Sequence, residues 1–158
     1  ARALVAARAL VAAARAAARP RAGPSPVPFP FEVVTPERTL AEGEAEMITL
    51  RSAEGDIAFL AGHVPYIGAV AICAAHVHRP DGTDEAFAIH GGFVEVSEGK
   101  LTLLAGVAER AGDIDAERAR RALSRAEGSP GEEAAEGEAA LRRAQVRLEL
   151  AESRTGTS

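Results

Sequence analysis

The stretch Gly91-Gly-Phe-Val-Glu-Val-Ser-Glu-Gly-Lys-Leu-Thr-Leu-Leu-Ala105 decides the fold of this chain of 158 residues. It contains two short apolar runs, at residues 93–96 and 101–104. Glu98-Gly99 separates the two runs, and Gly91-Gly92 stands before the first. Short apolar runs with turn residues between them are typical of β-strands, whereas a helix needs a longer periodic segment. We therefore predict strands at both runs, with turn residues at 91–92 and 98–99.

The same pattern continues toward the N-terminus as far as Phe29. Pro80-Asp-Gly-Thr83 is typical of a turn, and further predicted strands lie at residues 29–34, 45–50, 57–60, 67–78 and 87–90. Many short strands at regular spacing favour a small sandwich or barrel. We predict an antiparallel β-sandwich over residues 29–112, as the first part of an α+β fold in which the strands precede the helices.

Residues 113–158 follow a helical pattern and are predicted to form an α-helical hairpin with a short tail. Asp113 or Asp115 can cap a first helix that ends near residue 127, and Gly128-Ser-Pro-Gly131 separates it from a second helix over about residues 132–152. The facing residues are mostly alanine, which buries little area. We therefore expect the hairpin to be marginally stable by itself, as suits a conformational switch.

Residues 1–28 differ from the rest of the chain in composition. They carry five arginines and no acid, so the formal net charge of −5 leaves −10 on the remainder. This alanine- and arginine-rich extension ends in Gly23-Pro-Ser-Pro-Val-Pro28, a cluster of helix breakers. Its composition resembles an organelle transit peptide, and equally a wrongly chosen start of a reading frame. We predict a disordered or spurious extension.

Composition also argues against several classes of function. The acidic body is a poor binder of nucleic acid, because phosphate repels it. No run approaches the roughly 18 apolar residues that span a bilayer, so any membrane association must come through partners. Cys73 stands alone, which rules out an internal disulfide, and we expect it to be a small buried hydrophobe. Lys100 is the only lysine and lies outside any phosphate-binding loop, so the chain should not hydrolyse ATP itself.

Several motifs in a consistent order resemble one family over roughly residues 29–152. They are Val33-Val-Thr-Pro-Glu-Arg38, Glu42-Gly-Glu-Ala-Glu-Met47, Glu54-Gly-Asp-Ile-Ala-Phe-Leu-Ala-Gly-His-Val-Pro65, Gly91-Gly-Phe-Val-Glu-Val96, Leu101-Thr-Leu-Leu-Ala105, Ala108-Glu-Arg110 and Ile114-Asp-x-x-Arg118-Ala119. Together these motifs are similar to those of the epsilon subunit of bacterial F-type ATP synthases. The resemblance leaves residues 1–28 without a counterpart.

The resemblance implies a non-catalytic rotor subunit of the central stalk in the F1 part of a proton-driven rotary motor. Its expected partners are the gamma subunit, the ring of membrane-embedded c subunits and the alpha/beta catalytic head. The β-sandwich would sit at the foot of the stalk, and the hairpin would fold down or extend to inhibit ATP hydrolysis. The expected location is the cytoplasmic face of the bacterial plasma membrane, as a peripheral subunit.

Two sites on the predicted sandwich follow from the resemblance. Glu54 and Asp56 flank a glycine, and the position of Asp56 would face the polar loops of the c-ring. Such an acidic loop could pair with cationic loops, or be a solvated turn. His63 and Pro65 would lie at the interface with gamma, where we expect His63 to have a structural role rather than a catalytic one.

A third site concerns regulatory ATP, the only cofactor that the resemblance raises, and none is required. Arg118 and Arg125 are seven residues apart and share a helical face, and Arg143 and Arg147 share another. In an antiparallel hairpin the four guanidiniums could converge on a triphosphate. They match the family's ATP-contacting positions, together with Ile114 and Asp115. Solvated arginines in pairs along the helix are the alternative.

Two other functions compete with this interpretation. His76-Val-His78, with Glu85 and His90, has the residue types of a cupin-like metal enzyme, although its spacings depart from the usual pattern. A free-standing ATP-sensing module would share the arginines but would function without gamma.

Overall fold

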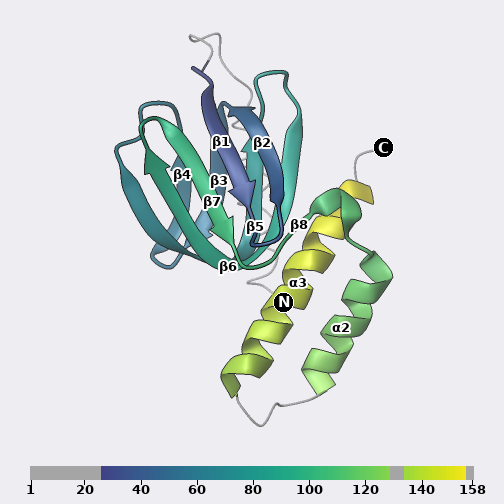
Figure 1. The fold of residues 1–158 in the computed structure, drawn as a ribbon. Coiled ribbons are helices and arrows are strands. Elements are labelled where there is room, and N and C mark those ends of the chain that lie inside the picture. The colour runs from purple at the N-terminus through teal and green to yellow at the C-terminus, as the bar shows by residue number, and fades with distance from the viewer. Residues whose placement is uncertain (1–25, 129–133, 156–158) are drawn as a thin grey trace, which may run out of the picture.

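The computed structural model describes residues 26–128 and 134–155, so residues 1–25 of the predicted extension lie outside the described residues. A β-sandwich is followed by two antiparallel helices, as predicted (Figure 1). The strands are β1 (Phe29–Val34), β2 (Thr39–Ala45), β3 (Met47–Ser52), β4 (Gly55–Phe59), β5 (Tyr66–His78), β6 (Asp84–Ser97), β7 (Lys100–Ala105) and β8 (Ala108–Arg110). A 3-10 turn (Ala111–Asp113) leads to the helices α2 (Ala116–Gly128) and α3 (Ala134–Thr155). The exact division of the chain into domains stays a prediction.

One hydrogen-bonded sheet forms both layers of the sandwich. Its strand order is β2-β1-β7-β6-β5-β3-β4, and β8 pairs with β6. Strand β2 is at one end of this order, yet the chain passes directly from β2 into β3 through Glu46, whose N–H donates to the carbonyl of His78. The sheet must therefore fold back on itself. All pairs are antiparallel except β1 with β7, which run parallel.

The core lies between the two layers, where side chains from both ends of the sheet meet. Phe31, Phe59 and Phe87 come from β1, β4 and β6, and none is more than 1% exposed. Cys73 is buried in the same core, as predicted, and burial raises the pKa of its thiol. Aliphatic side chains surround the rings, among them Val33, Ile48, Val77, Ile89, Val94, Leu101 and Leu103. A closed sandwich is what brings these distant strands into one cluster.

The prediction of a turn at Gly91-Gly92 was wrong, because β6 runs through both glycines as one strand. Gly92 has a φ of 149°, and a Cβ at this position would lie 2.0 Å from the carbonyl oxygen of Leu104 on β7. The glycine is needed for close approach of two backbones and not for a reversal of the chain. A long β6 can therefore pair with β5 along one side and with both β7 and β8 along the other.

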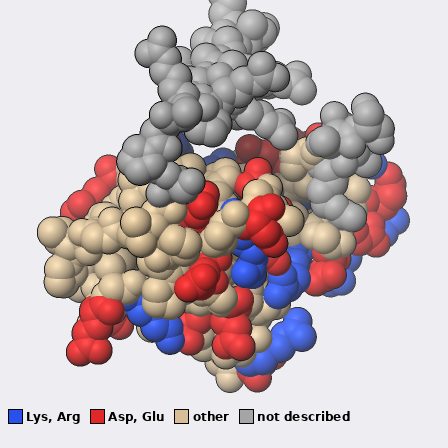
Figure 2. All heavy atoms as spheres, turned by 90° about the horizontal axis from the view of Figure 1, so that it is seen from above, with Lys and Arg blue, Asp and Glu red and all other residues tan. Residues whose placement is uncertain are grey.

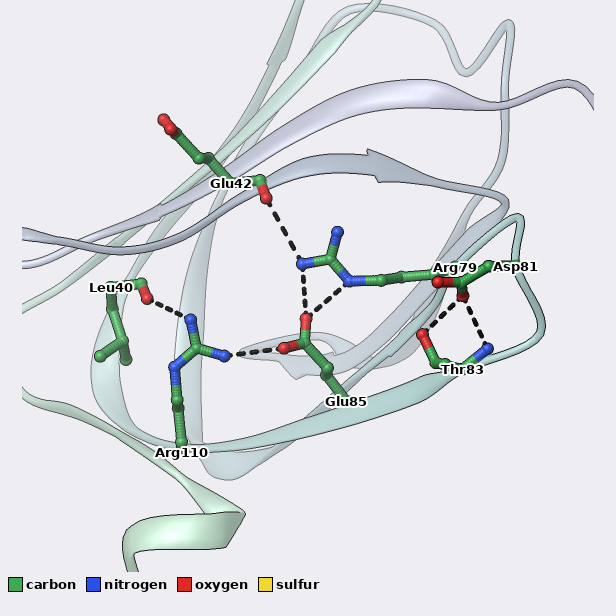
Figure 3. A network of polar contacts seen from close by, with 7 residues as sticks. All are labelled: Leu40, Glu42, Arg79, Asp81, Thr83, Glu85 and Arg110. Carbon is green, nitrogen blue, oxygen red and sulfur yellow. Dashed lines mark hydrogen bonds and ion pairs between the residues drawn. The ribbon is translucent and has the colours of Figure 1, made fainter.

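Strand β2 was not predicted, because Glu42-Gly-Glu44 gives it little apolar character. Side chains hold this edge strand in place (Figure 3). Arg110 donates to the carbonyl of Leu40 over 2.6 Å, and Arg79 donates to that of Glu42 over 3.4 Å. The carboxylate of Glu85 joins the two guanidiniums, with Arg79 on Oε2 and Arg110 on Oε1. Bonding of edge carbonyls by arginines leaves fewer of them open to another strand.

Helix α3 packs on the outer face of β5 and β6, and α2 packs on α3 (Figure 1). The strands present small or aliphatic side chains to the helix, namely Ile72, Ala74, Ala86 and Ala88. Ile114, Val146, Leu150 and Ala151 complete this cluster from the helical side. We call this cluster the hairpin contact. It is rich in alanine and therefore buries little apolar area per residue.

Candidate functional site

A pocket lies where the hairpin meets the end of β8. Its volume is about 240 Å³. Nine residues from β8, the 3-10 turn and both helices line it: Glu109, Asp113, Ile114, Asp115, Arg118, Ala119, Ala122, Arg125 and Arg147. Five of the six residues predicted to contact ATP are among them. The structure thus brings together side chains that are up to 38 positions apart in the sequence, as Glu109 and Arg147 are.

The chain at the start of α2 shapes one wall of the pocket. Ile114, two positions before the first residue of α2, is buried in the hairpin contact and so fixes the chain where the helix begins. The next residue, Asp115, accepts a hydrogen bond on Oδ1 from the backbone N–H of Arg118 over 3.0 Å. This is the geometry of a helix N-cap, and the same hydrogen bond holds the pKa of Asp115 below its usual value. Of the two predicted caps, Asp115 therefore makes the bond.

Arginines from both helices give the pocket its charge. Arg118 and Arg125 come from α2 and Arg147 from α3. Within residues 26–128 and 134–155, the side chains of Arg118 and Arg125 have no ion-pair partner. Ala119 and Ala122 also line the pocket, and their small side chains leave space between the arginines. Exposed guanidiniums around a small hollow can take a polyanion, because each offers several N–H donors and keeps its charge.

Arg143 is the sixth residue predicted for this site, and it does not line the pocket. It lies on α3 one helical turn before Arg147 and is half-buried. Its predicted part in nucleotide binding stays a prediction.

Glu109 is a pocket residue that sequence reasoning missed. Its Oε2 accepts from Nε2 of His90 over 2.8 Å and from Nε of Arg147 over 2.5 Å. The bond from His90, followed by that from Arg147, lowers the pKa of Glu109 from 4.5 to about 2. Ala108-Glu-Arg110 was recognised only as a family motif, and nothing in its spacing relates Glu109 to a histidine 19 positions earlier.

The residues of the cupin-like alternative do not form a metal centre. His78 bonds Asp84, His90 bonds Glu109, and Glu85 bonds two arginines. In the described part of the chain, no three His, Cys, Asp or Glu side chains are grouped as metal ligands would be. His78, Glu85 and His90 thus bond separate partners, and the register pairs Glu85 with Val77, so that it lies on the other face of the sheet from His76 and His78.

The acidic loop is the turn between β3 and β4. Asp56 forms two hydrogen bonds with Arg51, of 2.8 and 3.1 Å, and they hold its pKa below the usual value. Ser52 donates to the carbonyl of Gly55 and closes the turn. Glu54 is exposed, and its carboxylate has no bonding partner among the residues described here. The two acidic residues of the predicted site therefore differ in their bonding, since Asp56 is already paired with Arg51 and Glu54 is not paired among the described residues.

The loop between β4 and β5 contains the two residues predicted for a protein interface. Nδ1 of His63 lies 2.8 Å from the carbonyl oxygen of Val64, to which it donates. The ring of His63 also packs near those of Phe59 and Tyr66, with centroids 4.9 and 5.9 Å away. These contacts fit the structural role expected of His63. Pro65 is exposed.

Beyond the hairpin contact, the outer face of the same strands is uncovered. We call Ile67, Phe93 and Leu104 the apolar patch, and they are 73%, 57% and 44% exposed. Phe93 lies directly opposite Leu104 on β7 and Ala69 on β5, so the patch crosses three strands. The other large exposed hydrophobic residues in the described part of the chain are Val27, Leu60, Val64 and Val107. A contiguous apolar surface of this kind marks an interaction site.

Charged side chains are mixed on the end of the sandwich that lies away from the hairpin. Figure 2 shows this end, where uncharged residues cover one side of the surface and acidic and basic groups stand together over the rest. Among the described residues visible in this view, basic groups stand beside acidic ones and form no continuous basic area of the kind that binds a phosphate backbone. Among the helices that the structure describes, none is long and apolar enough to cross a membrane.

Comparison with known proteins agrees with the motifs. Residues 28–111 match the family model of the ATP synthase delta/epsilon chain, beta-sandwich domain. The ATP synthase epsilon chain of Streptomyces avermitilis is 40% identical over 124 residues, which are 78% of this chain and 94% of the relative. That of Dehalococcoides mccartyi is 41% identical over 130 residues, which are 78% and 91% of the two chains.

A solved structure with the same fold is a chain of the Euglena gracilis mitochondrial ATP synthase, from a structure of its OSCP/F1/c-ring part. The TM-score is 0.70 at 27% sequence identity, over 83% of this chain and 85% of that chain. The chain described here therefore belongs to the delta/epsilon family of ATP synthase subunits.

Proposed function

We propose that the chain is a non-catalytic rotor subunit of a proton-driven ATP synthase, which connects the c-ring to gamma and regulates ATP hydrolysis through its hairpin. The observation that carries the regulatory part is the pocket at the root of the hairpin, where arginines of both helices face a common hollow. The rotor part rests on the epsilon chains that the sequence matches over more than nine-tenths of their length.

The apolar patch is the surface that we assign to gamma. A β-sheet that exposes Ile67, Phe93 and Leu104 side by side needs a partner with an apolar face of its own. His63 and Pro65 lie in the loop that leads into β5, the strand that carries Ile67. An aromatic residue near the centre of such a surface contributes much of the binding energy.

The turn between β3 and β4 is the surface that we assign to the c-ring. Glu54 is free to pair with a cationic loop, whereas Asp56 is bonded to Arg51 and keeps the turn in shape. Such charge pairing speeds docking more than it raises affinity. We place the subunit at the cytoplasmic face of a bacterial plasma membrane, bound to the membrane only through these partners.

Regulation would follow from the position of the pocket. A triphosphate bound by Arg118, Arg125 and Arg147 joins α2 to α3 while α3 lies on the sandwich. ATP therefore favours the docked hairpin by the difference in its affinity for the docked and released states. When ATP is scarce, the hairpin leaves the sandwich and reaches the alpha/beta catalytic head, where it inhibits hydrolysis.

Binding to gamma tests the rotor assignment. We expect residues 26–158 to form a one-to-one complex with a bacterial gamma subunit in size-exclusion chromatography. Phe93→Thr should weaken this complex about tenfold or more. Val27→Thr is the matched control, since Val27 is also exposed but lies outside the patch. A chain that ignores gamma yet binds ATP would favour the free-standing ATP sensor instead.

Equilibrium binding of ATP tests the pocket. Arg118→Ala and Arg125→Ala should each weaken ATP binding about tenfold or more, because each removes charge-assisted hydrogen bonds. Arg121→Ala is the control, since Arg121 is on the same helix but does not line the pocket. Equal affinities of all three variants would contradict the assignment.

A further inference from the structure

His90 is a buried polar residue beneath helix α3. Its side chain is 3% exposed, and Nε2 lies 2.8 Å from Oε2 of Glu109 on β8. The pKa of Glu109 is lowered to about 2, so at neutral pH its carboxylate has no proton to give. The hydrogen of this bond must therefore be on Nε2 of His90. His90 donates, and Glu109 accepts.

The other ring nitrogen of His90, Nδ1, takes no part in this bond. Nδ1 is buried and lacks any hydrogen-bond partner there. A buried polar atom without a partner is unfavourable, whereas an aliphatic side chain of similar size would leave no such atom. An imidazole at this position is thus explained by its bond to Glu109 and not by packing.

Glu109 links His90 to an arginine of the pocket. The same Oε2 that accepts from His90 also accepts from Nε of Arg147 on α3. Both Glu109 and Arg147 line the pocket. The bond engages only Nε of the guanidinium, and the described residues provide no partner for its two terminal nitrogens. These nitrogens are left for a ligand.

We propose that His90 is a positioning residue of the nucleotide pocket: it holds Glu109, and Glu109 in turn aims Arg147 at the phosphates of a nucleoside triphosphate. This inference deepens the function proposed above and rests on nucleotide binding at that pocket. An arginine that is already ordered loses less freedom when a phosphate binds, so the chain of contacts raises affinity. His90 itself does not touch the nucleotide.

Two substitutions in the full chain separate the hydrogen bond from the packing. His90→Gln keeps an N–H donor at a similar reach, and His90→Leu fills the same buried space without a donor. We expect His90→Leu to weaken ATP binding about tenfold in calorimetry, the lower end of what loss of a supporting contact costs a binding site. His90→Gln should restore most of that affinity. If His90→Leu does not fold, His90→Met takes its place as a second variant without a hydrogen-bond donor.

A double-mutant cycle and an NMR signal exclude a merely structural role. In a Glu109→Ala background, His90→Leu should change the ATP affinity no further, because the chain of contacts is already broken. The Nε–H signal of Arg147 should shift or broaden in His90→Leu and stay in place in His90→Gln. A histidine that only supports packing would weaken binding equally in both backgrounds and would leave that signal unchanged.

The outcomes also separate this proposal from the one on which it rests. Equal ATP affinity of wild type and His90→Leu would overturn the role of His90, while the contrast between Arg118→Ala and Arg121→Ala would still support the pocket. A wild-type chain that binds no ATP would overturn both. An unchanged Arg147 signal in His90→Leu would overturn the positioning role even if the affinity fell.

Discussion

The core of the sandwich and the hairpin contact are built from different side chains. The core holds four buried phenylalanine rings, surrounded largely by branched aliphatic residues. The hairpin contact relies on alanines and a few larger residues such as Ile114, Val146 and Leu150. Because hydrophobic stabilisation grows with the apolar area removed from water, the hairpin contact is the weaker of the two. The chain thus joins a firmly packed sandwich to a hairpin that is held by less apolar area.

The largest expected loss of stability comes from a cavity in the core of the sandwich. Phe59→Ala removes a ring that is 0% exposed and lies far along the chain from the hairpin. We expect a loss of about 3–5 kcal/mol in the free energy of unfolding. Urea unfolding followed by circular dichroism should show strands and helices lost together at a lower midpoint. A sandwich that keeps its stability would contradict the position of the core.

A cavity in the hairpin contact should act locally. Leu150→Ala removes about 2–5 kcal/mol of packing, which is enough to release α3 from β5 and β6. Amide signals of the sandwich core should keep their positions in NMR spectra, and signals of residues facing α3, such as Ala88, should shift. If Leu150→Ala instead unfolds the whole chain, the two parts are a single cooperative unit.

The bond between Glu109 and Arg147 should make the hairpin contact sensitive to acid. The pKa of Glu109 is lowered to about 2, first by His90 and then by Arg147. Its contribution is therefore complete above about pH 4.5 and is lost as the pH falls toward 2. The side chain is 35% exposed, so solvent screens the pair and the effect should be about 1 kcal/mol or less.

Glu109→Gln provides the comparison for this effect. The variant should show weaker docking of α3 at neutral pH and should lack the change between pH 4.5 and 2 that wild type shows, as read from the methyl signals of Val146 and Leu150. Other carboxylates titrate in both chains, so only the difference between the two curves counts. Two identical curves would mean that the pair does not hold the helix.

The smallest expected effect concerns the apolar patch. Phe93→Thr exchanges an exposed side chain on a surface that no part of the described chain covers. The free energy of unfolding should change by no more than about 0.5 kcal/mol, while binding to gamma weakens. A large loss of stability in thermal unfolding would show that Phe93 stabilises the sandwich itself, and would contradict its assignment as a binding residue only.

The sequence predicted the elements that have a strong apolar pattern. The strands at 29–34 and 101–104 and both helices were expected, and so were the order of strands before helices and the alanine-rich hairpin. Strand β2 was missed because its carbonyls are bonded by Arg79, directly after β5, and by Arg110 on β8. Gly92 was predicted to be part of a turn. The sequence alone does not distinguish a glycine at which the chain reverses from a glycine that lets a neighbouring strand approach closely.

The pocket was predicted in part for a similar reason. Regular spacing along α2 indicated that Arg118 and Arg125 share a face, and the family motif added Ile114 and Asp115. Glu109 was missed as a pocket residue, and His90 as its support, because Glu109 meets His90 and Arg147 only after β6, β8 and α3 have packed together. Which arginine of α3 reaches the pocket depends on how that helix is rotated on the sheet, and periodicity along one helix does not give this angle.

Hydrogen exchange of the wild-type chain, with and without ATP, tests the central claim most directly. If a weakly held hairpin closes on ATP, amides of α2 and α3 should open at a lower free energy than those of β5, β6 and β7. Addition of ATP should then slow exchange in the two helices and leave the sandwich strands unchanged. Exchange of all amides through one global opening, or helices whose exchange ignores ATP, would contradict the account.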